Sequence, residues 1–188
     1  MAVVLMGNVW RDARTIADLG QNMAGWLEGR ISARPGYLDS RPDSETLHLV
    51  PSLVVLNRGG IVTVDSQPGL AGRGYDGAHW RQKAYVETFI DDRGPLLKRA
   101  MRAAESAGLG VIRNNRVPAV PVPFTDRDGQ PITGITVKYP RNQLAREWEG
   151  IGRQAFRELR SHGVHLTFYD PVWGRDDRLW SVLMGAVR

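Results

Sequence analysis

The stretch LNRGGIVTVDSQPG, from Leu56 to Gly69, decides which fold the sequence predicts. Gly59 and Gly60 end a preceding helix, because glycine readily adopts the left-handed conformation found at helix ends. The next residues, IVTVD at 61–65, alternate as a β-strand does, and SQPG directly after them is a turn signal. A helix, a strand and a turn in immediate succession indicate a chain that mixes helices with strands.

Toward the N-terminus, the sequence predicts two helices separated by a loop. Apolar residues recur at spacings of three and four over residues 10–30, which is a helical pattern. Residues 31–43 are rich in Pro, Gly, Ser and Asp and predict a loop. Asp43 or Ser44 then caps a second helix. We expect Pro51 to kink that helix, because proline lacks the backbone N–H that a helix interior needs.

Toward the C-terminus, helices and strands continue to alternate. We expect a glycine-rich loop at 69–79, a strand in KAYVETFI, a helix from Gly94 to Gly108, a strand at 110–113, a hairpin at 124–138 that turns at Asp128-Gly129, a helix at 142–161, a strand in VHLTFY and a closing helix at 178–187. This order predicts a single α/β or α+β domain over residues 1–188.

The composition excludes several classes of protein. The 188 residues are 42% hydrophobic and 24% charged, which suffices for a core without disulfides or metals. The absence of cysteine excludes a disulfide scaffold, a cysteine nucleophile and a thiolate zinc site. The apolar start MAVVLM is too short for a signal peptide or a membrane span, so we expect a cytoplasmic protein that does not bind membranes.

Charge and motif searches give no catalytic or nucleic-acid signature. The net charge is +5, but the basic residues are spread along the chain, so nucleic-acid binding is a minor interpretation. His162 and His165 are separated by Gly163, and turn or capping roles are favoured over a two-metal site for Asp126 and Asp128. No nucleophile elbow, dinucleotide fingerprint or P-loop pattern occurs.

Polar residues gather between positions 44 and 67, where packing alone does not require them. They are Glu45 and Thr46 in a first helical turn, Thr63 and Asp65 on one face of the strand, and Ser66 and Gln67 just past its end. Ligands of α/β folds bind beyond the carboxyl ends of strands, and hydroxyls, a carboxylate and helix-terminal N–H groups suit a polar ligand. Simple capping and turn roles explain the same residues equally well.

Three blocks occur here in a characteristic order: SET at 44–46, LNRGGIVTVDSQPG at 56–69 and QKAYVETF at 82–89. Together they resemble the C-terminal regulatory domain of methylenetetrahydrofolate reductase, and WRDARTIADLG and DDRLW extend a weaker similarity toward both ends. The resemblance implies a domain of mixed β-sheets surrounded by helices. In eukaryotic reductases this domain binds S-adenosylmethionine and S-adenosylhomocysteine.

The resemblance also implies a set of ligand contacts. Carried over by position, they are Glu45, Thr46, Thr63 and Ser66, with Thr136 from a more divergent segment. The reductase barrel is absent from this chain, so no flavin, NADPH or folate chemistry follows. The segment GYDGAHW replaces a longer loop of the family, and Asp65 stands where the family usually has Asn.

We therefore expect a stand-alone protein that binds S-adenosylmethionine or S-adenosylhomocysteine as a sensor or regulatory module, without reductase catalysis. The sequence does not choose between the two ligands or identify a protein partner. One alternative is an interaction module for protein or nucleic acid that has lost the ligand. The other, ranked last, is an enzyme that uses Glu45, Asp65 or a histidine on a nucleoside-like substrate in the same pocket.

Overall fold

A computed structural model describes residues 9–37, 41–115, 121–135 and 141–188. Helices and strands follow one another along these segments. Their bounds are α1 Val9–Asp12, α2 Ile16–Leu27, the 3-10 helix η1 Ser44–Leu49, α3 Val50–Arg58, β1 Ile61–Gln67, β2 Leu70–Arg73, β3 His79–Gln82, β4 Tyr85–Asp91, α4 Leu96–Ser106, β5 Gly110–Arg113, β6 Val122–Arg127, β7 Gln130–Ile135, α5 Arg141–Glu147, α6 Arg153–His162, β8 Gly163–Tyr169 and α7 Arg178–Val187.

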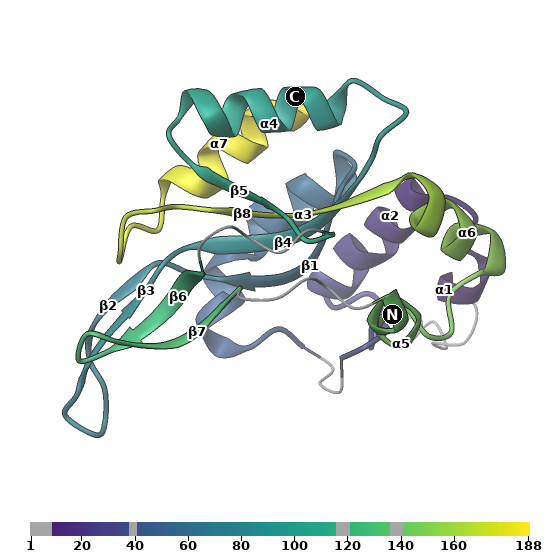
Figure 1. The fold of residues 1–188 in the computed structure, drawn as a ribbon. Helices are drawn as coiled ribbons and strands as arrows, with labels where there is room; N and C mark the ends of the chain where they lie inside the picture. The colour runs from purple at the N-terminus through teal and green to yellow at the C-terminus, as the bar shows by residue number, and fades with distance from the viewer. Residues whose placement is uncertain (1–8, 38–40, 116–120, 136–140) are drawn as a thin grey trace.

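The strands form two four-stranded sheets. Sheet A has the order β1-β4-β8-β5, and sheet B has the order β2-β3-β6-β7. Every strand pair within the described segments is antiparallel, so the predicted mixture of helices and strands is confirmed as the α+β class. Sheet A lies among the helices, whereas sheet B extends away from them at the lower left of Figure 1.

Antiparallel register divides sheet A into an apolar and a polar face, because directly opposed residues project to the same side. One face carries the fully buried side chains of Val86, Ile90, Leu166 and Phe168, with Ile61 opposite Ile90. Helices α4 and α7 lie along one side of this sheet (Figure 1) and contribute buried residues to the same core. The other face carries most of the polar residues considered below.

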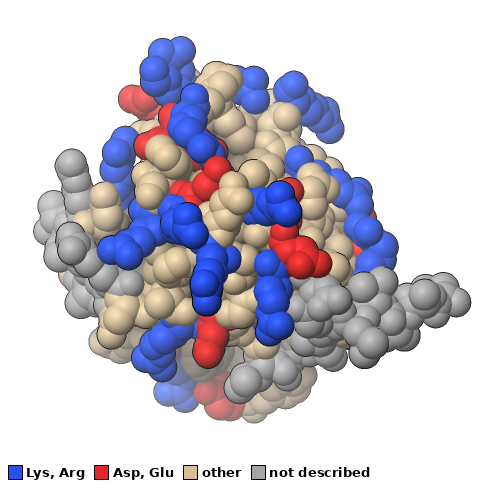
Figure 2. Space-filling view, turned by 90° about the vertical axis from the view of Figure 1, so that its right-hand side faces the viewer, with Lys and Arg blue, Asp and Glu red and all other residues tan. Residues whose placement is uncertain are grey.

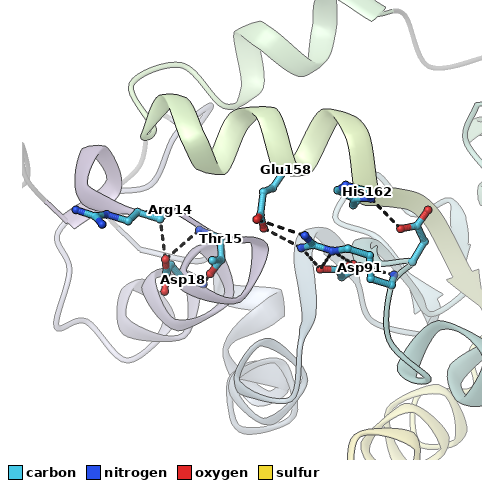
Figure 3. A network of polar contacts seen from close by, with 8 residues as sticks. Arg14, Thr15, Asp18, Asp91, Glu158 and His162 are labelled. Atoms are coloured by element: carbon cyan, nitrogen blue, oxygen red, sulfur yellow. Dashed lines mark hydrogen bonds and ion pairs between the residues drawn. The ribbon is translucent and has the colours of Figure 1, made fainter.

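Polar contacts cap the start of α2 and attach α6 to the rest of the fold (Figure 3). The hydroxyl of Thr15 accepts a hydrogen bond from the Asp18 N–H, and the Asp18 carboxylate accepts one from the Thr15 N–H, so the two residues form a capping box. Arg93, just after β4, pairs with Asp91 and with Glu158 of α6. These contacts hold α6 beside the end of β4.

Two predicted helices are each interrupted in the structure, so their predicted bounds are wrong. The helix expected over 10–30 breaks before Thr15, because the capping box starts a new helix there. The helix expected over 142–161 divides into α5 and α6, with Gly152 between them. The Gly152 N–H donates to the Trp10 carbonyl, and a Cβ at this position would lie 2.0 Å from the Ala13 carbonyl oxygen. Long-range backbone contact therefore sets the break.

Two further predictions about local structure are corrected. Pro51 does not kink a long helix: it lies in the first turn of α3, where its missing N–H has no intrahelical partner to lose. Residues 70–82 are not only a loop, since they form β2, β3 and a short turn that Gly77 closes with a positive φ of 76°. The hairpin turn at Asp128-Gly129 is confirmed, with φ values of 49° and 83°. No helix in the described ranges has the length and apolarity needed to span a bilayer.

Candidate ligand-binding cleft

A row of polar side chains crosses the second face of sheet A. The Tyr85 hydroxyl donates a hydrogen bond to Asp65 Oδ2 at 2.7 Å. Two residues along β4, on the same face, Glu87 contacts the Nε2 atom of His165 on β8. The His165 ring stacks on Phe89 with 4.3 Å between centroids. The row therefore joins the edge strand β1 to the middle of the sheet through charged and polar groups.

A cleft lies at the β1 end of this row. Its narrower arm has a volume of about 50 Å³, and the described residues that line it come from α2, the following loop, η1, α3 and β1: Met23, Trp26, Leu27, Arg34, Tyr37, Pro42, Asp43, Thr46, Leu53, Thr63, Val64, Asp65 and Ser66. A wider arm of about 290 Å³ shares Met23, Arg34, Tyr37, Val64 and Asp65 and continues toward Glu87 and Trp148. The shared residues make the two hollows parts of one cleft.

Three of the predicted contact residues meet in the narrower arm. Thr46 from η1 and Thr63 and Ser66 from β1 all line it, although 14 residues (47–60) separate Thr46 from the strand. Glu45 is exposed and does not line either arm among the described residues. Thr136 lies outside the described residues.

The three hydroxyls differ in their hydrogen bonding. Thr63 is buried, and its Oγ1 accepts a hydrogen bond from Asn57 Nδ2 at 2.7 Å, while its backbone N–H donates to Asn57 Oδ1. Within the described parts of the chain, the hydroxyls of Thr46 and Ser66 have no hydrogen-bond partner. Thr63 is therefore engaged by α3, whereas Thr46 and Ser66 are available to a ligand.

A β-bulge changes the geometry expected for β1. Thr63 is opposite Thr88 and Asp65 is opposite Glu87, two consecutive residues of β4 that project to opposite faces. The expectation that Thr63 and Asp65 share one face is therefore wrong, because Val64 is an extra residue that shifts the alternation. The shift sends Asp65 toward Tyr85 and Glu87 while Thr63 contacts α3.

Gln67 has a structural role that the sequence analysis did not anticipate. It is the last residue of β1 and not part of a turn beyond it. Its amide nitrogen donates to the carbonyls of Lys83 and Phe124, and its amide oxygen accepts from the Thr125 hydroxyl at 3.1 Å. Because both ends of the amide are engaged, Gln67 joins sheet A to sheet B and is not available to a ligand in the cleft.

Arg34 is a lining residue that sequence reasoning missed. It lies in the loop after α2, and its guanidinium carbon is 5.0 Å from the Trp26 ring centroid and 4.5 Å from that of Tyr37. Such positions over aromatic rings are favourable for a guanidinium. An arginine followed by proline in a polar loop carries no sequence signal for a site, since only the fold brings it opposite β1.

The cleft shifts the pKa values of its ionisable groups. Enclosure by the surrounding protein raises the pKa of Asp65, although its side chain still faces the solvent within the cleft, and the charge of Glu87 adds to this effect. Burial is also the main cause that raises the pKa of Tyr85, with the neighbouring carboxylates of Asp65 and Glu87 contributing. Burial lowers the pKa of Arg34, and the charge of Asp65 opposes this shift.

Residues 6–188 match the model of a protein family described as a domain of unknown function, DUF6919. The chain belongs to this family. The matched range includes every residue that lines the cleft as well as Glu45 and Thr136. No curated protein matches the chain.

A second cavity lies on the other side of His165. It has a volume of about 730 Å³, and residues that include Phe89, Asn114, Phe156 and Arg160 line it together with His165. Asn114 hydrogen-bonds to His165 and to the Thr167 hydroxyl, so these polar groups hold one another in place. In the described residues, no group of three or more His, Asp or Glu side chains has a metal-binding arrangement.

The charged surface near α6 is mixed in sign. Figure 2 shows the side of the molecule that lies to the right in Figure 1, where basic side chains are scattered and acidic ones lie between them. In α6, for example, the exposed Arg157 is next to Glu158, which pairs with Arg93. Nucleic-acid binding usually uses an uninterrupted basic patch, so this face offers no specific support for that alternative.

Proposed function

We propose that the protein binds S-adenosylmethionine or S-adenosylhomocysteine in the cleft beside β1 and acts as a sensor or regulatory module without reductase catalysis. One observation carries the proposal. Thr46 and Ser66 belong to two separate sequence blocks, yet both line the same arm of the cleft, and their hydroxyls have no hydrogen-bond partner among the described residues.

The chemistry of the cleft suits a polar nucleoside ligand. Hydroxyl groups both donate and accept hydrogen bonds, as ribose hydroxyls and adenine nitrogens require. Met23, Val64 and the ring of Tyr37 provide apolar wall between these polar groups. Small-molecule sites combine a mostly apolar wall with a few placed polar groups, and their volumes begin at about 300 Å³, close to that of the wider arm.

Isothermal titration calorimetry tests the proposal, with each ligand titrated separately into the full chain. We expect binding by the wild type and about 10-fold weaker binding by Ser66→Ala, because a lost hydrogen bond to a buried polar ligand atom costs about 1–3 kcal/mol. Thr46→Val should weaken binding similarly while keeping the side-chain volume.

A matched control is Ser106→Ala, which removes an exposed hydroxyl at the end of α4 and should leave binding unchanged. If neither ligand gives heat with protein whose circular dichroism shows it to be folded, the proposed function is wrong. Chromatography of S-adenosylmethionine after incubation distinguishes binding from catalysis, since new products would favour an enzyme in the same cleft.

A further inference from the structure

Arg34 forms no close ion pair in the described part of the chain, although the charges of Asp65 and Glu147 act on it from a greater distance. None of the ion pairs or hydrogen bonds found there involves its guanidinium, which is packed against Trp26 and Tyr37 instead. Its Nε atom is buried without a hydrogen-bond acceptor. A partly buried guanidinium normally pairs with a carboxylate or phosphate, because desolvation of an unpaired charge is costly.

The walls around Arg34 contain buried N–H donors that have no acceptor within the described parts of the chain. Four buried side-chain polar atoms in the described residues lack a partner, and three of them are N–H donors of residues that line the cleft: Trp26 Nε1, Arg34 Nε and Trp148 Nε1. The two indole nitrogens are buried, so a ligand in the cleft would not contact them directly. The unpaired Arg34 Nε donor favours a ligand group that accepts hydrogen bonds.

The carboxylate of Asp65 provides the complementary charge within the same cleft. Asp65 lines both arms together with Arg34, and Glu87 and Glu147 add two further carboxylates in the wider arm. The Asp65 oxygens accept from the Tyr85 hydroxyl and the Ser66 N–H. A carboxylate has about four acceptor positions, so Asp65 retains capacity for a further donor.

We infer that the cleft recognises the α-amino-acid part of its ligand, with the carboxylate on the Arg34 guanidinium and the ammonium group on Asp65. This inference rests on the proposed function and adds the chemical group that determines ligand choice. A guanidinium binds a carboxylate through two parallel N–H···O bonds, and Asp65 is the acidic residue that lines both arms with it. Ligands that contain the nucleoside but lack the amino acid should therefore bind without help from Arg34.

The test compares two thioether nucleosides on one variant. S-adenosylhomocysteine carries the amino-acid part, whereas 5′-methylthioadenosine lacks it. In calorimetry, Arg34→Gln should weaken S-adenosylhomocysteine binding at least about 10-fold, or about 1.4 kcal/mol, and leave the affinity for 5′-methylthioadenosine within about 2-fold of the wild type. Arg34→Lys should recover part of the loss, because it restores the charge without the planar pair of donors.

The control Arg102→Gln removes an exposed arginine on α4 and should affect neither ligand. If Arg34→Gln weakens both ligands equally, Arg34 only supports the cleft wall and the inference is overturned. Unchanged affinity for S-adenosylhomocysteine would overturn it as well, while leaving the proposed function intact. If the wild type binds neither nucleoside nor S-adenosylmethionine, the proposed function itself fails, and the inference fails with it.

Discussion

Sheet A and sheet B have the same number of strands and the same antiparallel pairing, but different interactions hold them together. In sheet A, four of the seven residues in each central strand are buried, none is exposed, and helices pack against them. In sheet B, β2 is exposed along its whole length and β7 along all but its last residue. Figure 1 shows sheet B extending beyond the helices.

Sheet B compensates for its small core with polar and aromatic contacts. Asp76 pairs with Arg127 at 2.8 Å and accepts a hydrogen bond from the Trp80 indole. Arg127 also lies 5.8 Å from the Trp80 ring centroid. Asp126 is buried and accepts hydrogen bonds from Arg81 and the Gly129 N–H. Sheet A therefore depends on the burial of apolar side chains, whereas sheet B depends on ion pairs, hydrogen bonds and aromatic contacts.

The largest expected effect comes from removing one large apolar side chain from each sheet. Phe168→Ala in sheet A should lower the free energy of unfolding by about 3–5 kcal/mol, because the side chain is fully buried and its removal leaves a cavity. Ile132→Ala in sheet B should change it by less than about 0.5 kcal/mol, because Ile132 is exposed. Urea denaturation measures both, and equal losses would contradict the distinction.

An intermediate effect is expected when a polar support of sheet B is removed. Asp126→Ala should lower the free energy of unfolding by about 1–3 kcal/mol, because it leaves the Gly129 N–H of the hairpin turn without its acceptor. Thr133→Ala, at an exposed position of the neighbouring strand, is the matched control and should be nearly neutral. An equally small effect of both substitutions would show that the polar contacts do not support sheet B.

The smallest effects are expected from two aspartates whose pKa values shift in opposite directions. Hydrogen bonds from Trp80 and the Ala78 N–H, with the Arg127 ion pair, lower the pKa of Asp76. Its stabilising contribution is present above its unfolded pKa of about 3.9 and is lost as the pH falls through the lower folded value. Asp76→Asn should therefore lower the melting temperature at neutral pH, with a difference that shrinks toward about pH 3.

The sign is reversed for Asp65, whose pKa is raised chiefly by its enclosure in the cleft. As the pH rises above about 3.9, the unfolded chain releases this proton first, so stability falls until the folded pKa is passed. Asp65→Asn should therefore raise the melting temperature at neutral pH and leave it unchanged at about pH 3. Thermal melts across this pH range measure both variants, and shifts of the same sign at pH 7 would refute the assignment.

The same contrast explains how much of the fold could be predicted. Strands β4 and β8 and helices α4 and α7 follow apolar patterns because one face of each is buried, so periodicity indicates them. Strands β2 and β3 have no buried face, so their pattern resembled a loop. The break before α2 can be predicted from Thr15 and Asp18, which have the spacing of a capping box. The break at Gly152 cannot, because its close contact with Ala13 depends on the tertiary fold.

The cleft was predictable to a similar extent. The motifs indicated Thr46, Thr63 and Ser66, which the structure brings to one arm, but the bulge at Val64 and the position of Arg34 had no local signal. A bulge arises from pairing between strands, and the loop that carries Arg34 is held by Tyr37 against Trp26 of α2 and by the hydrogen bond from the Trp10 indole to the Ala33 carbonyl. Neither the bulge nor the position of this loop can be predicted from the spacing of nearby residues.

The bulge at Val64 also affects the tendency of the chain to aggregate. Strand β1 is at the edge of sheet A, where unpaired backbone groups offer a template for a strand of another molecule. An irregular edge is a poor template, because a bulge twists the strand and interrupts its regular ladder. Deletion of Val64 would make the strand regular, while Asp65 and Ser66 could keep their present partners Glu87 and Val86 on β4. Val64 thus lines the cleft and, through the bulge, makes the edge of sheet A a poor template for strand pairing.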